Sequence, residues 1–380
     1  MGKRQSWPSV VALGLLAGCG SSAKPAEEPI VPAAAPEADV EAEQVQAIAK
    51  AVNEFGPAVH TCWARAAAED FHVSGRVVLA LDMLGSGSAR ASVTEDAVKR
   101  SILSECLVAL WQDYQWPTSF VEGDRIELPP FEFVAPESQY VVALAHVPVR
   151  GDSDGVREQL LLTEANTGNA QGRMSLVSLS GGASVSLNDA SSTSLLFVFS
   201  GTGLVQSSGK GKTVRAGSGV HVVPASPASI RQSGDEPLEF LRFSSANGVA
   251  GVKAARVPRV REVLESKALP ILGGKGEVRI LFDEATSGEA VANYIGALTA
   301  KANAIVPAHR HSHSTEYLFV LEGRVDMDIG GQRAQLQPGD AVQIPPGVLH
   351  RAEVIGDESF KAIQFYSPGG PEQRFKGESK

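Results

Sequence analysis

The sequence has no excess of positive charge and no long hydrophobic segment. Its 34 lysine and arginine residues are fewer than its 43 aspartate and glutamate residues, which gives a formal net charge of −9 at pH 7. A protein that binds nucleic acid through its phosphates needs a basic face, so nucleic acid is not expected as the main partner. No apolar run reaches the roughly 18 residues that a transmembrane helix needs, so no transmembrane helix is expected either.

Cysteine and aromatic residues are also scarce, whereas turn-forming residues are abundant. The chain has three cysteines and 6% aromatic residues, against 38 glycines and 22 prolines. This composition predicts a globular protein with many turns. A length of 380 residues predicts two to three domains.

The N-terminus has the organisation of an export signal. Lys3 and Arg4 precede the apolar stretch Val10–Ala17, which has the length of a signal-peptide core. Cys19 follows small residues, and this arrangement resembles the lipobox of bacterial lipoproteins. The resemblance implies cleavage before Cys19 and acylation of that residue; an ordinary secretory signal with an accidental cysteine is the alternative. Gly20, where an aspartate would favour the inner membrane, indicates the outer membrane.

Residues 1–18 are therefore predicted to be a signal peptide and residues 19–40 a tether. The tether consists mainly of proline, alanine and glutamate, a composition that cannot bury enough apolar surface to fold and that favours a disordered, semi-extended chain. The predicted protein is bound to the membrane through the lipid on Cys19. It belongs to the bacterial cell envelope, at the outer membrane and facing the periplasm.

Residues 41–136 are predicted to form a small α+β domain. The expected order of its elements is α-β-β-α-β. Helical spacing is found over residues 41–51 and 58–69 on either side of Gly56-Pro57; strands are expected at 75–82 and 89–94, a helix at 97–114 and a last strand near 126–133.

Two cysteines, Cys62 and Cys106, lie in the predicted helices of this domain. An even pair in an exported protein favours a disulfide, which would stabilise the fold by roughly 4 kcal/mol in the chain-entropy treatment. Two free, buried thiols are the alternative.

The same domain resembles the AgmX/PglI C-terminal domain, a TonB-like module of envelope proteins. The resemblance rests on a cysteine in each helix, on the segment GRVVLALD at 75–82, on the glycine hairpin after it and on Trp116-Pro117. It implies that residues 41–136 contact an envelope protein partner.

The rest of the chain is a duplication. Gly201–Ser245 aligns without a gap with Gly323–Ser367 at a constant separation of 122 residues, and Leu161–Ala170 aligns with Leu281–Ala290. Both copies have short alternating strands with glycine and proline turns, which is typical of a β-sandwich or barrel.

We call residues 137–246 the first copy and residues 269–370 the second copy. Residues 247–268 between them are predicted to be a connector, with a short helix from Pro258 to Lys267.

The second copy carries side chains that can ligate a metal. Four of the eight histidines in the chain lie there: His309, His311, His313 and His350. Strand residues two apart face the same way, so His309 and His311 can both point into a barrel. Imidazoles and a carboxylate form a typical donor set for first-row transition metals.

Two segments of the second copy resemble the two cupin motifs. The first reads HxHxxxxExxxxxxG from His309 to Gly323, and the second reads GxxxxxPxGxxH from Gly339 to His350. The resemblance implies a cupin barrel that binds one divalent metal, which could be Mn, Fe, Zn or Ni. It implies three histidines and one glutamate as ligands: His309, His311, Glu316 and His350.

His313 leaves a second arrangement open, because His311, His313 and Glu316 form a similar pattern with a shorter gap. The arrangement with His309 fits the motif better. His313 is then expected to contact the ligands or to lie at the entrance of the site, and Tyr317 to contact the ligands. Tyr317 and Asp326 are the nearest candidates for a general acid or base, and both also fit ordinary strand residues.

The first copy lacks the ligand set. At the separation of 122 residues, the four ligand positions hold Leu187, Asp189, Ser194 and Ala228. The first copy is therefore predicted to be a degenerate, metal-free cupin domain.

The sequence thus predicts a mainly β protein: two tandem cupin β-barrels of jelly-roll type after a small TonB-C-like α+β domain and a disordered N-terminal tether. For function we expect an exported, lipid-anchored protein that binds a divalent metal and either binds a small-molecule ligand or takes part in envelope assembly. The alternative is a periplasmic metal-dependent enzyme, a dioxygenase, decarboxylase or isomerase, that acts on a small acid or phenol. Fold alone cannot separate these functions.

Overall fold

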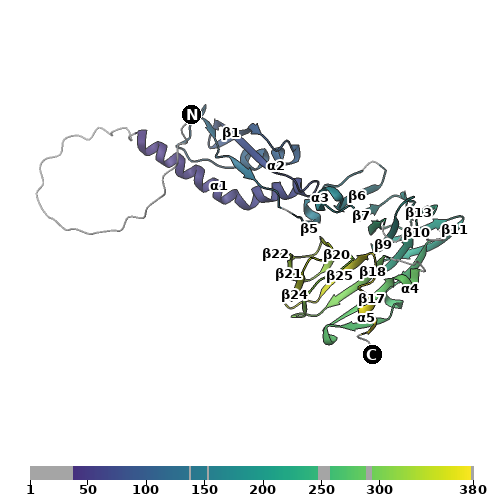
Figure 1. Ribbon diagram of the computed structural model, residues 1–380. Coiled ribbons are helices and arrows are strands. Elements are labelled where there is room, and N and C mark those ends of the chain that lie inside the picture. The colour runs from purple at the N-terminus through teal and green to yellow at the C-terminus, as the bar shows by residue number, and fades with distance from the viewer. Residues whose placement is uncertain (1–36, 137, 152–153, 247–256, 288–292, 378–380) are drawn as a thin grey trace, which may run out of the picture.

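The computed structural model describes residues 37–136, 138–151, 154–246, 257–287 and 293–377 (Figure 1). The predicted signal peptide and Cys19 lie outside the described residues. Among the described residues, no helix is long and apolar enough to cross a membrane.

The α+β domain is built around one central strand. Its elements are α1 (Glu37–Ala67), β1 (Gly75–Gly85), β2 (Ser88–Asp96), α2 (Ser101–Gln112), β3 (Arg125–Glu127) and β4 (Phe131–Phe133). β1 pairs antiparallel with β2, β3 and β4. The single last strand expected near residues 126–133 is thus two short strands on the same edge of β1.

Helix α1 is one continuous helix, where the sequence predicted two. It begins at Glu37, inside the range expected to be tether, and continues through Pro57. A proline inside a helix removes one backbone hydrogen bond. The helix continues because Ala51 before the proline and Cys62 after it are buried in the same apolar core, so both halves gain from staying aligned.

A disulfide joins α1 to α2. Cys62 and Cys106 are bonded, with their Cα atoms 5.6 Å apart and 44 residues between them in sequence, so the predicted pairing is confirmed. The bond lies beside the core around Trp111, which is fully buried. A cross-link of this kind restricts the unfolded chain and so favours the folded domain.

The first copy folds into two antiparallel sheets. Its elements are β6 (Val156–Leu162), α3 (Glu164–Thr167), β7 (Gly172–Leu179), β8 (Ser184–Ser186), β9 (Thr193–Ser200), β10 (Thr202–Ser207), β11 (Lys210–Arg215), β12 (Ser218–Val222), β13 (Ala228–Gln232) and β14 (Leu238–Ser245), with β15 (Arg259–Glu262) added from the connector. The strand orders are β15-β12-β9-β14-β7-β6 and β11-β10-β13-β8.

The second copy repeats this arrangement. Its elements are β16 (Ala268–Ile271), β17 (Gly276–Phe282), α4 (Glu284–Ser287), β18 (Tyr294–Ala300), β19 (Ile305–His309), β20 (Thr315–Glu322), β21 (Arg324–Ile329), β22 (Gln332–Leu336), β23 (Asp340–Ile344), β24 (His350–Ile355) and β25 (Phe360–Ser367), followed by α5 (Gln373–Gly377). The strand orders are β16-β17-β18-β25-β20-β23-β5, where β5 (Val141–Ala143) comes from the first copy, and β19-β24-β21-β22.

The two copies exchange their first strands. β5 belongs to the first copy in sequence but pairs with β23 of the second, and β15 pairs with β12 of the first. The helix expected from Pro258 to Lys267 is therefore wrong: this segment forms β15 and a single 3₁₀ turn, Val263–Glu265. An open edge of β12 offers backbone hydrogen bonds to this segment, and a pairing of this kind is set by tertiary context rather than by local sequence.

The two larger sheets pack face to face through an apolar layer. The equivalent residues Phe243 and Phe365 stack with their ring centroids 4.9 Å apart, and the hydroxyls of Ser245 and Ser367 lie 2.6 Å apart. Contacts between equivalent residues are the signature of a two-fold axis, so an approximate two-fold axis relates the two copies.

Alternation along the strands separates this layer from the barrel interiors. On β25, Phe365 faces the layer between the copies, whereas Gln364 and Tyr366 are turned to the interior of the second copy. On β20, Tyr317 faces the layer and Glu316 faces the interior. The sheet that joins the copies therefore also carries the candidate site on its other face.

The α+β domain contacts the barrels at the end of α1. The side-chain amide of Asn166, in α3, donates a hydrogen bond of 2.6 Å to the carbonyl oxygen of Ala68. The backbone N–H of Phe71 donates to the carbonyl oxygen of Ala165 at 3.3 Å. Figure 1 shows α1 running from the α+β domain toward this contact.

Candidate metal centre

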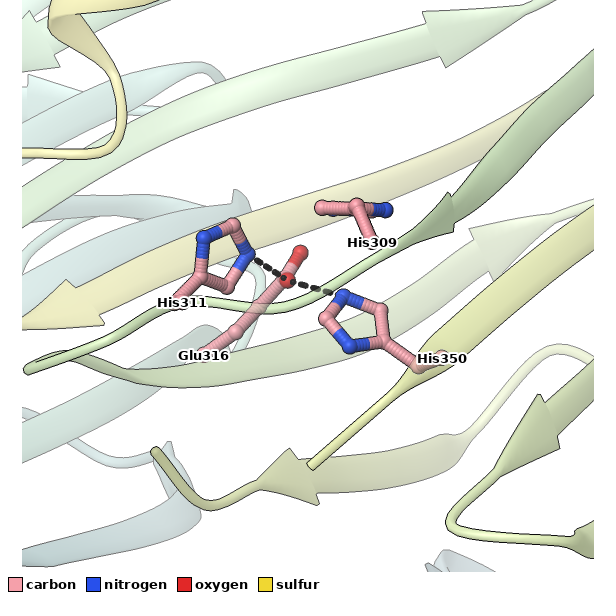
Figure 2. Close-up of side chains that lie close together, drawn as sticks. All are labelled: His309, His311, Glu316 and His350. Atoms are coloured by element: carbon pink, nitrogen blue, oxygen red, sulfur yellow. Dashed lines mark hydrogen bonds and ion pairs between the residues drawn. The ribbon is translucent and has the colours of Figure 1, made fainter. Parts of the chain in front are cut away.

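Four side chains converge inside the second copy (Figure 2). They are His309, His311, Glu316 and His350, and their nearest ligand atoms all lie within 4.8 Å of one another. His309 is the last residue of β19 and pairs with His350, the first residue of β24. His311 lies in the loop after β19, and Glu316 lies on β20. The structure therefore brings together the four residues that the cupin motifs imply as ligands.

The carboxylate of Glu316 lies between two imidazoles, as the dashed lines in Figure 2 show. Its Oε2 atom is 3.0 Å from Nε2 of His311 and 3.3 Å from Nε2 of His350. Their exposed fractions are 6% for His311, 5% for Glu316 and 2% for His350. The rings of His309 and His350 lie with their centroids 4.2 Å apart.

Backbone carbonyl groups orient two of the imidazoles. Nδ1 of His309 donates a hydrogen bond of 2.9 Å to the carbonyl oxygen of Pro307, and Nδ1 of His350 donates one of 3.0 Å to that of Val348. With the proton on Nδ1, each Nε2 carries a lone pair turned toward the cluster. The Nε2 atom of His309 is buried without a hydrogen-bond partner among the described residues, whereas the Nε2 atom of His350 lies 3.3 Å from Oε2 of Glu316. An unsatisfied buried polar atom destabilises a fold, and a cation bound by these lone pairs would remove that cost.

The protonation states suit a metal site. Burial alone would raise the pKa of Glu316, but the neighbouring His311 and His350 outweigh burial and hold that pKa well below its usual value. Burial lowers the pKa of His309, and the neighbouring His350 lowers it further. Burial would also lower the pKa of His350, but the adjacent carboxylate of Glu316 outweighs burial and raises it, so binding of a metal at His350 would displace a proton. An ionised carboxylate and a neutral imidazole are the forms that bind a metal.

A hydrogen-bond network also holds the other carboxylate oxygen of Glu316, Oε1. The side-chain amide of Gln364 donates to Oε1 of Glu316 at 2.6 Å and to the hydroxyl of Tyr366 at 2.9 Å. Tyr294 donates to the amide oxygen of Gln364 at 3.4 Å. All of these residues are buried. Partners of this kind fix the orientation of a ligand.

A cavity of about 260 Å³ opens beside the cluster. Most of its lining is apolar, with Leu298, Val325, Met327 and Phe360 among the lining side chains. Arg374, on α5, lines the cavity as well, and its guanidinium donates a hydrogen bond of 3.3 Å to the hydroxyl of Tyr366. The cavity therefore combines an apolar body, one cation and the cluster.

Sequence reasoning missed Gln364, Tyr366 and Arg374. Alternation along β25 could have found the first two, because Phe365 between them matches Phe243 and both neighbours must then face the other side of the sheet. No signal in the sequence pointed to Arg374, which lies after the last strand.

Three residues expected near the ligands lie elsewhere. Tyr317 is adjacent to Glu316 on β20 and so faces the opposite side of the sheet, where its ring packs against Phe243. His313 is exposed and lies outside the cluster. Asp326 is exposed, and its carboxylate accepts a hydrogen bond from Gln335. These positions correct the expectation that Tyr317 and His313 contact the ligands, and they remove Tyr317 and Asp326 as acid–base candidates at this site.

The first copy has no equivalent cluster. Among the described residues, the group in the second copy is the one set of three or more His, Cys, Asp or Glu side chains with the spacing to hold a metal ion. The positions that correspond to the four ligands hold Leu187, Asp189, Ser194 and Ala228.

Comparison with known proteins places this barrel in a family. A cupin-domain profile matches residues 298–366, which contain all four cluster residues. The polyketide synthase CurC of Streptomyces cyaneus is 30% identical over 114 residues, which are 30% of this chain and 72% of that protein. The tetracenomycin polyketide synthase protein TcmJ of Streptomyces glaucescens is 24% identical over 115 residues, 30% of this chain and 76% of that one.

Solved structures extend the likeness to both copies. Oxalate decarboxylase from Lactobacillus farciminis, in a formate complex, matches with a TM-score of 0.52 and 15% identity over 62% of this chain and 88% of that one. Oxalate decarboxylase from Bacillus subtilis matches with a TM-score of 0.51 and 16% identity over 62% and 79%. At these identities the likeness shows the fold, and it confirms the predicted pair of jelly-roll barrels. The chain belongs to the cupin superfamily.

Proposed function

We propose that the second copy binds one divalent transition-metal ion through His309, His311, Glu316 and His350. The observation that carries this proposal is the convergence of four ligand atoms within 4.8 Å of one another, with the buried Nε2 atom of His309 left without a partner beside an ionised Glu316. Three imidazole nitrogens and one carboxylate oxygen suit Mn, Fe, Zn or Ni. When bound, the metal would supply a Lewis-acid centre.

The proposed ligand of this centre is a small organic acid with an apolar body. The apolar lining of the cavity suits a hydrocarbon group. Arg374 supplies a guanidinium at the same cavity, and a guanidinium pairs with a carboxylate through charged hydrogen bonds. Arg374 is exposed, so it would meet the acid group at the opening of the cavity.

Metal content measured on two histidine variants tests the metal proposal. His350→Ala removes a buried Nε2 from the cluster and is expected to abolish stoichiometric metal in purified, metal-loaded protein. His313→Ala is the matched control, because His313 is exposed and lies close in sequence to the cluster; it is expected to retain one metal per chain. Elemental analysis after dialysis measures both. Full metal in His350→Ala, or loss of metal in His313→Ala, would contradict this ligand set.

A metal-dependent enzyme is the second candidate function. The observation in its favour is the cavity directly beside the cluster, in a barrel pair whose fold is similar to that of the oxalate decarboxylase structures. Against it, Arg374 is the one titratable side chain lining that cavity besides the cluster residues, and arginine is a poor general acid or base because it stays protonated. Turnover assays with Mn, Fe, Ni and Zn on a panel of small acids and phenols discriminate between the two. The whole chain is required, because β5 and β15 are exchanged between the copies.

We also propose that the protein is exported and held in the cell envelope by the lipid on Cys19, with the α+β domain in contact with an envelope protein. The Cys62–Cys106 disulfide supports export, because disulfides persist in oxidising compartments. Cys19→Ser is expected to move the protein from the membrane fraction to the soluble fraction of the cell. Unchanged membrane fractionation would contradict lipid anchoring at this residue.

A further inference from the structure

The first copy contains a polar cavity of its own. It has a volume of about 150 Å³, and its lining consists of charged and hydroxyl side chains: Glu158, Arg173, Ser175, Asp189, Arg242 and Ser244. β6, β7 and β14 carry five of these residues, and Asp189 lies after β8. The second copy's cavity, in contrast, is lined mainly by apolar side chains.

This cavity is lined by residues equivalent to those in the hydrogen-bond network behind the metal cluster of the second copy and to one of its ligands, His311, which corresponds to Asp189. In the matched strand registers, Arg242 stands at the position of Gln364 and Ser244 at that of Tyr366. Ser194 stands at the position of the glutamate ligand, and its hydroxyl lies 3.2 Å from that of Ser244. At the four ligand positions, the first copy thus has two apolar core residues, Leu187 and Ala228, and two polar residues, Asp189 and Ser194.

Arg242 is the cation that this cavity leaves available. Within the described residues its guanidinium makes one hydrogen bond, from Nη1 to the carbonyl oxygen of Ser186 at 3.4 Å. A guanidinium has five N–H donors, so most of its donors have no protein acceptor. Burial lowers the pKa of Arg242, but arginine remains charged in proteins.

The other charged groups of the cavity already have partners. Arg173 forms an ion pair of 3.7 Å with Glu158. Oδ1 of Asp189 accepts hydrogen bonds from the backbone N–H groups of Ser191 and Ser192 at 2.8 and 3.0 Å, which ties this carboxylate to its own loop. Glu158 and Asp189 also attract Arg242 electrostatically, but within the described residues neither carboxylate accepts a hydrogen bond from its guanidinium, which leaves those donors for a ligand.

We propose that the first copy binds a small hydrophilic carboxylate, held by the guanidinium of Arg242 and by the hydroxyls of Ser175 and Ser244. A carboxylate matches the planar donor pair of a guanidinium in a bidentate contact. The small volume and polar lining select a compact anion such as acetate or glycolate over the larger, apolar acid proposed for the second copy. This site needs no metal, so the proposal can be tested independently of the function proposed for the second copy.

Calorimetric titration of the whole chain with glycolate tests the proposal. The protein carries Arg374→Gln and is stripped of metal with a chelator, so that binding in the second copy does not contribute. One saturable site is expected. Arg242→Gln, which installs the residue that the second copy has at this position, is expected to weaken glycolate binding about 10- to 100-fold. Arg231→Gln is the matched control, an exposed arginine of the same copy outside the cavity, and is expected to leave binding unchanged.

Two further variants keep the test decisive if Arg242→Gln unfolds the barrel. Ser244→Ala is expected to weaken binding several-fold. Asp189→Asn is expected to tighten binding about twofold or more at low salt, because it removes a negative charge from the cavity wall while keeping an oxygen for the loop. No saturable binding of glycolate, equal binding in Arg242→Gln and the parent, or tighter binding of glycine than of glycolate would overturn the proposal, the last because it would indicate a zwitterion site.

Discussion

The two copies carry different side chains on one face of the same strands and similar ones on the other. Toward the barrel interior, the second copy has Glu316, Gln364 and Tyr366, where the first copy has Ser194, Arg242 and Ser244. Toward the layer between the copies, both have large apolar residues in the equivalent strands: Leu195, Phe197, Leu241 and Phe243 in the first copy, and Tyr317, Phe319, Ile363 and Phe365 in the second.

This difference indicates that the face toward the layer stabilises the fold, whereas the face toward the barrel interior determines what each barrel can bind. The apolar layer buries side chains from both copies at once, so a polar substitution there would affect the whole pair of barrels. The interior face of each barrel is lined mainly by that barrel's own side chains, and its polar side chains can change as long as their hydrogen bonds are satisfied. The two copies thus share one apolar layer, while the interior of each barrel carries its own set of polar side chains.

Substitutions in the layer between the copies are expected to have the largest effect, because this layer is shared by both barrels. Phe243→Ala and Phe365→Ala each remove a fully buried ring from the same stack. Each is expected to lower the free energy of unfolding by about 3–5 kcal/mol, measured by denaturant titration. The double variant is expected to cost about 0.5–3 kcal/mol less than the two single losses together, because the rings contact each other. Additive losses would contradict a shared layer.

Much of this arrangement could be predicted from the sequence, because the signals are local or repeated. The resemblance of the segment from His309 to His350 to the cupin motifs implied the four cluster residues, and the ungapped repeat indicated two copies of one fold. The disulfide followed from the number of cysteines in a chain expected to be exported. These inferences depend on residue types at fixed separations and, for the ligands, on the resemblance that those residues carry.

The rest depends on contacts between distant segments. The exchange of β5 and β15 is a choice of pairing partner, and local sequence does not encode it. Arg374 reaches the cavity from α5, which docks through an ion pair of 2.5 Å between Lys376 and the buried Asp283, 93 residues away in sequence. Tyr317 is a different case, because it is adjacent to Glu316 on a strand and adjacent strand residues face opposite sides of a sheet. The alternation along this strand therefore predicts that Tyr317 points away from the ligands.

The two faces of β20 and β25 can be compared directly through metal affinity. Gln364→Leu removes the donor that holds Oε1 of Glu316 and is expected to weaken metal binding about 10- to 100-fold, measured by competition with a chromogenic chelator. Tyr317→Phe is the matched control on the layer side, where its hydroxyl lies 3.4 Å from the side-chain amide of Asn169. It is expected to leave metal affinity unchanged. An equal loss in both variants would show that the faces are not independent.

The smallest expected difference lies in the turns that follow β6 in the first copy and β17 in the second, and it is a difference in pH dependence. In the first copy, Thr163 caps α3 through a neutral exchange of hydrogen bonds with Asn166. In the second, Asp283 stands at the equivalent position, accepts a hydrogen bond of 3.0 Å from the backbone N–H of Thr286 and pairs with Lys376. Burial would raise the pKa of Asp283, but Lys376 and Thr286 outweigh burial and lower it.

A carboxyl whose pKa is lowered on folding stabilises the fold above its unfolded-state pKa, near 4, and that stabilisation is lost as the pH falls through the lower folded-state value. Asp283→Asn is therefore expected to cost about 1.5 kcal/mol at pH 7 and progressively less below about pH 4. Thr163→Ala is expected to cost about 1 kcal/mol at every pH, because no ionisable group takes part in that cap. Urea unfolding at pH 7, 5 and 3 measures the free energy of unfolding of both variants. If the loss of stability had the same pH dependence in the two variants, the charge on Asp283 would not stabilise the contact between α5 and the barrel.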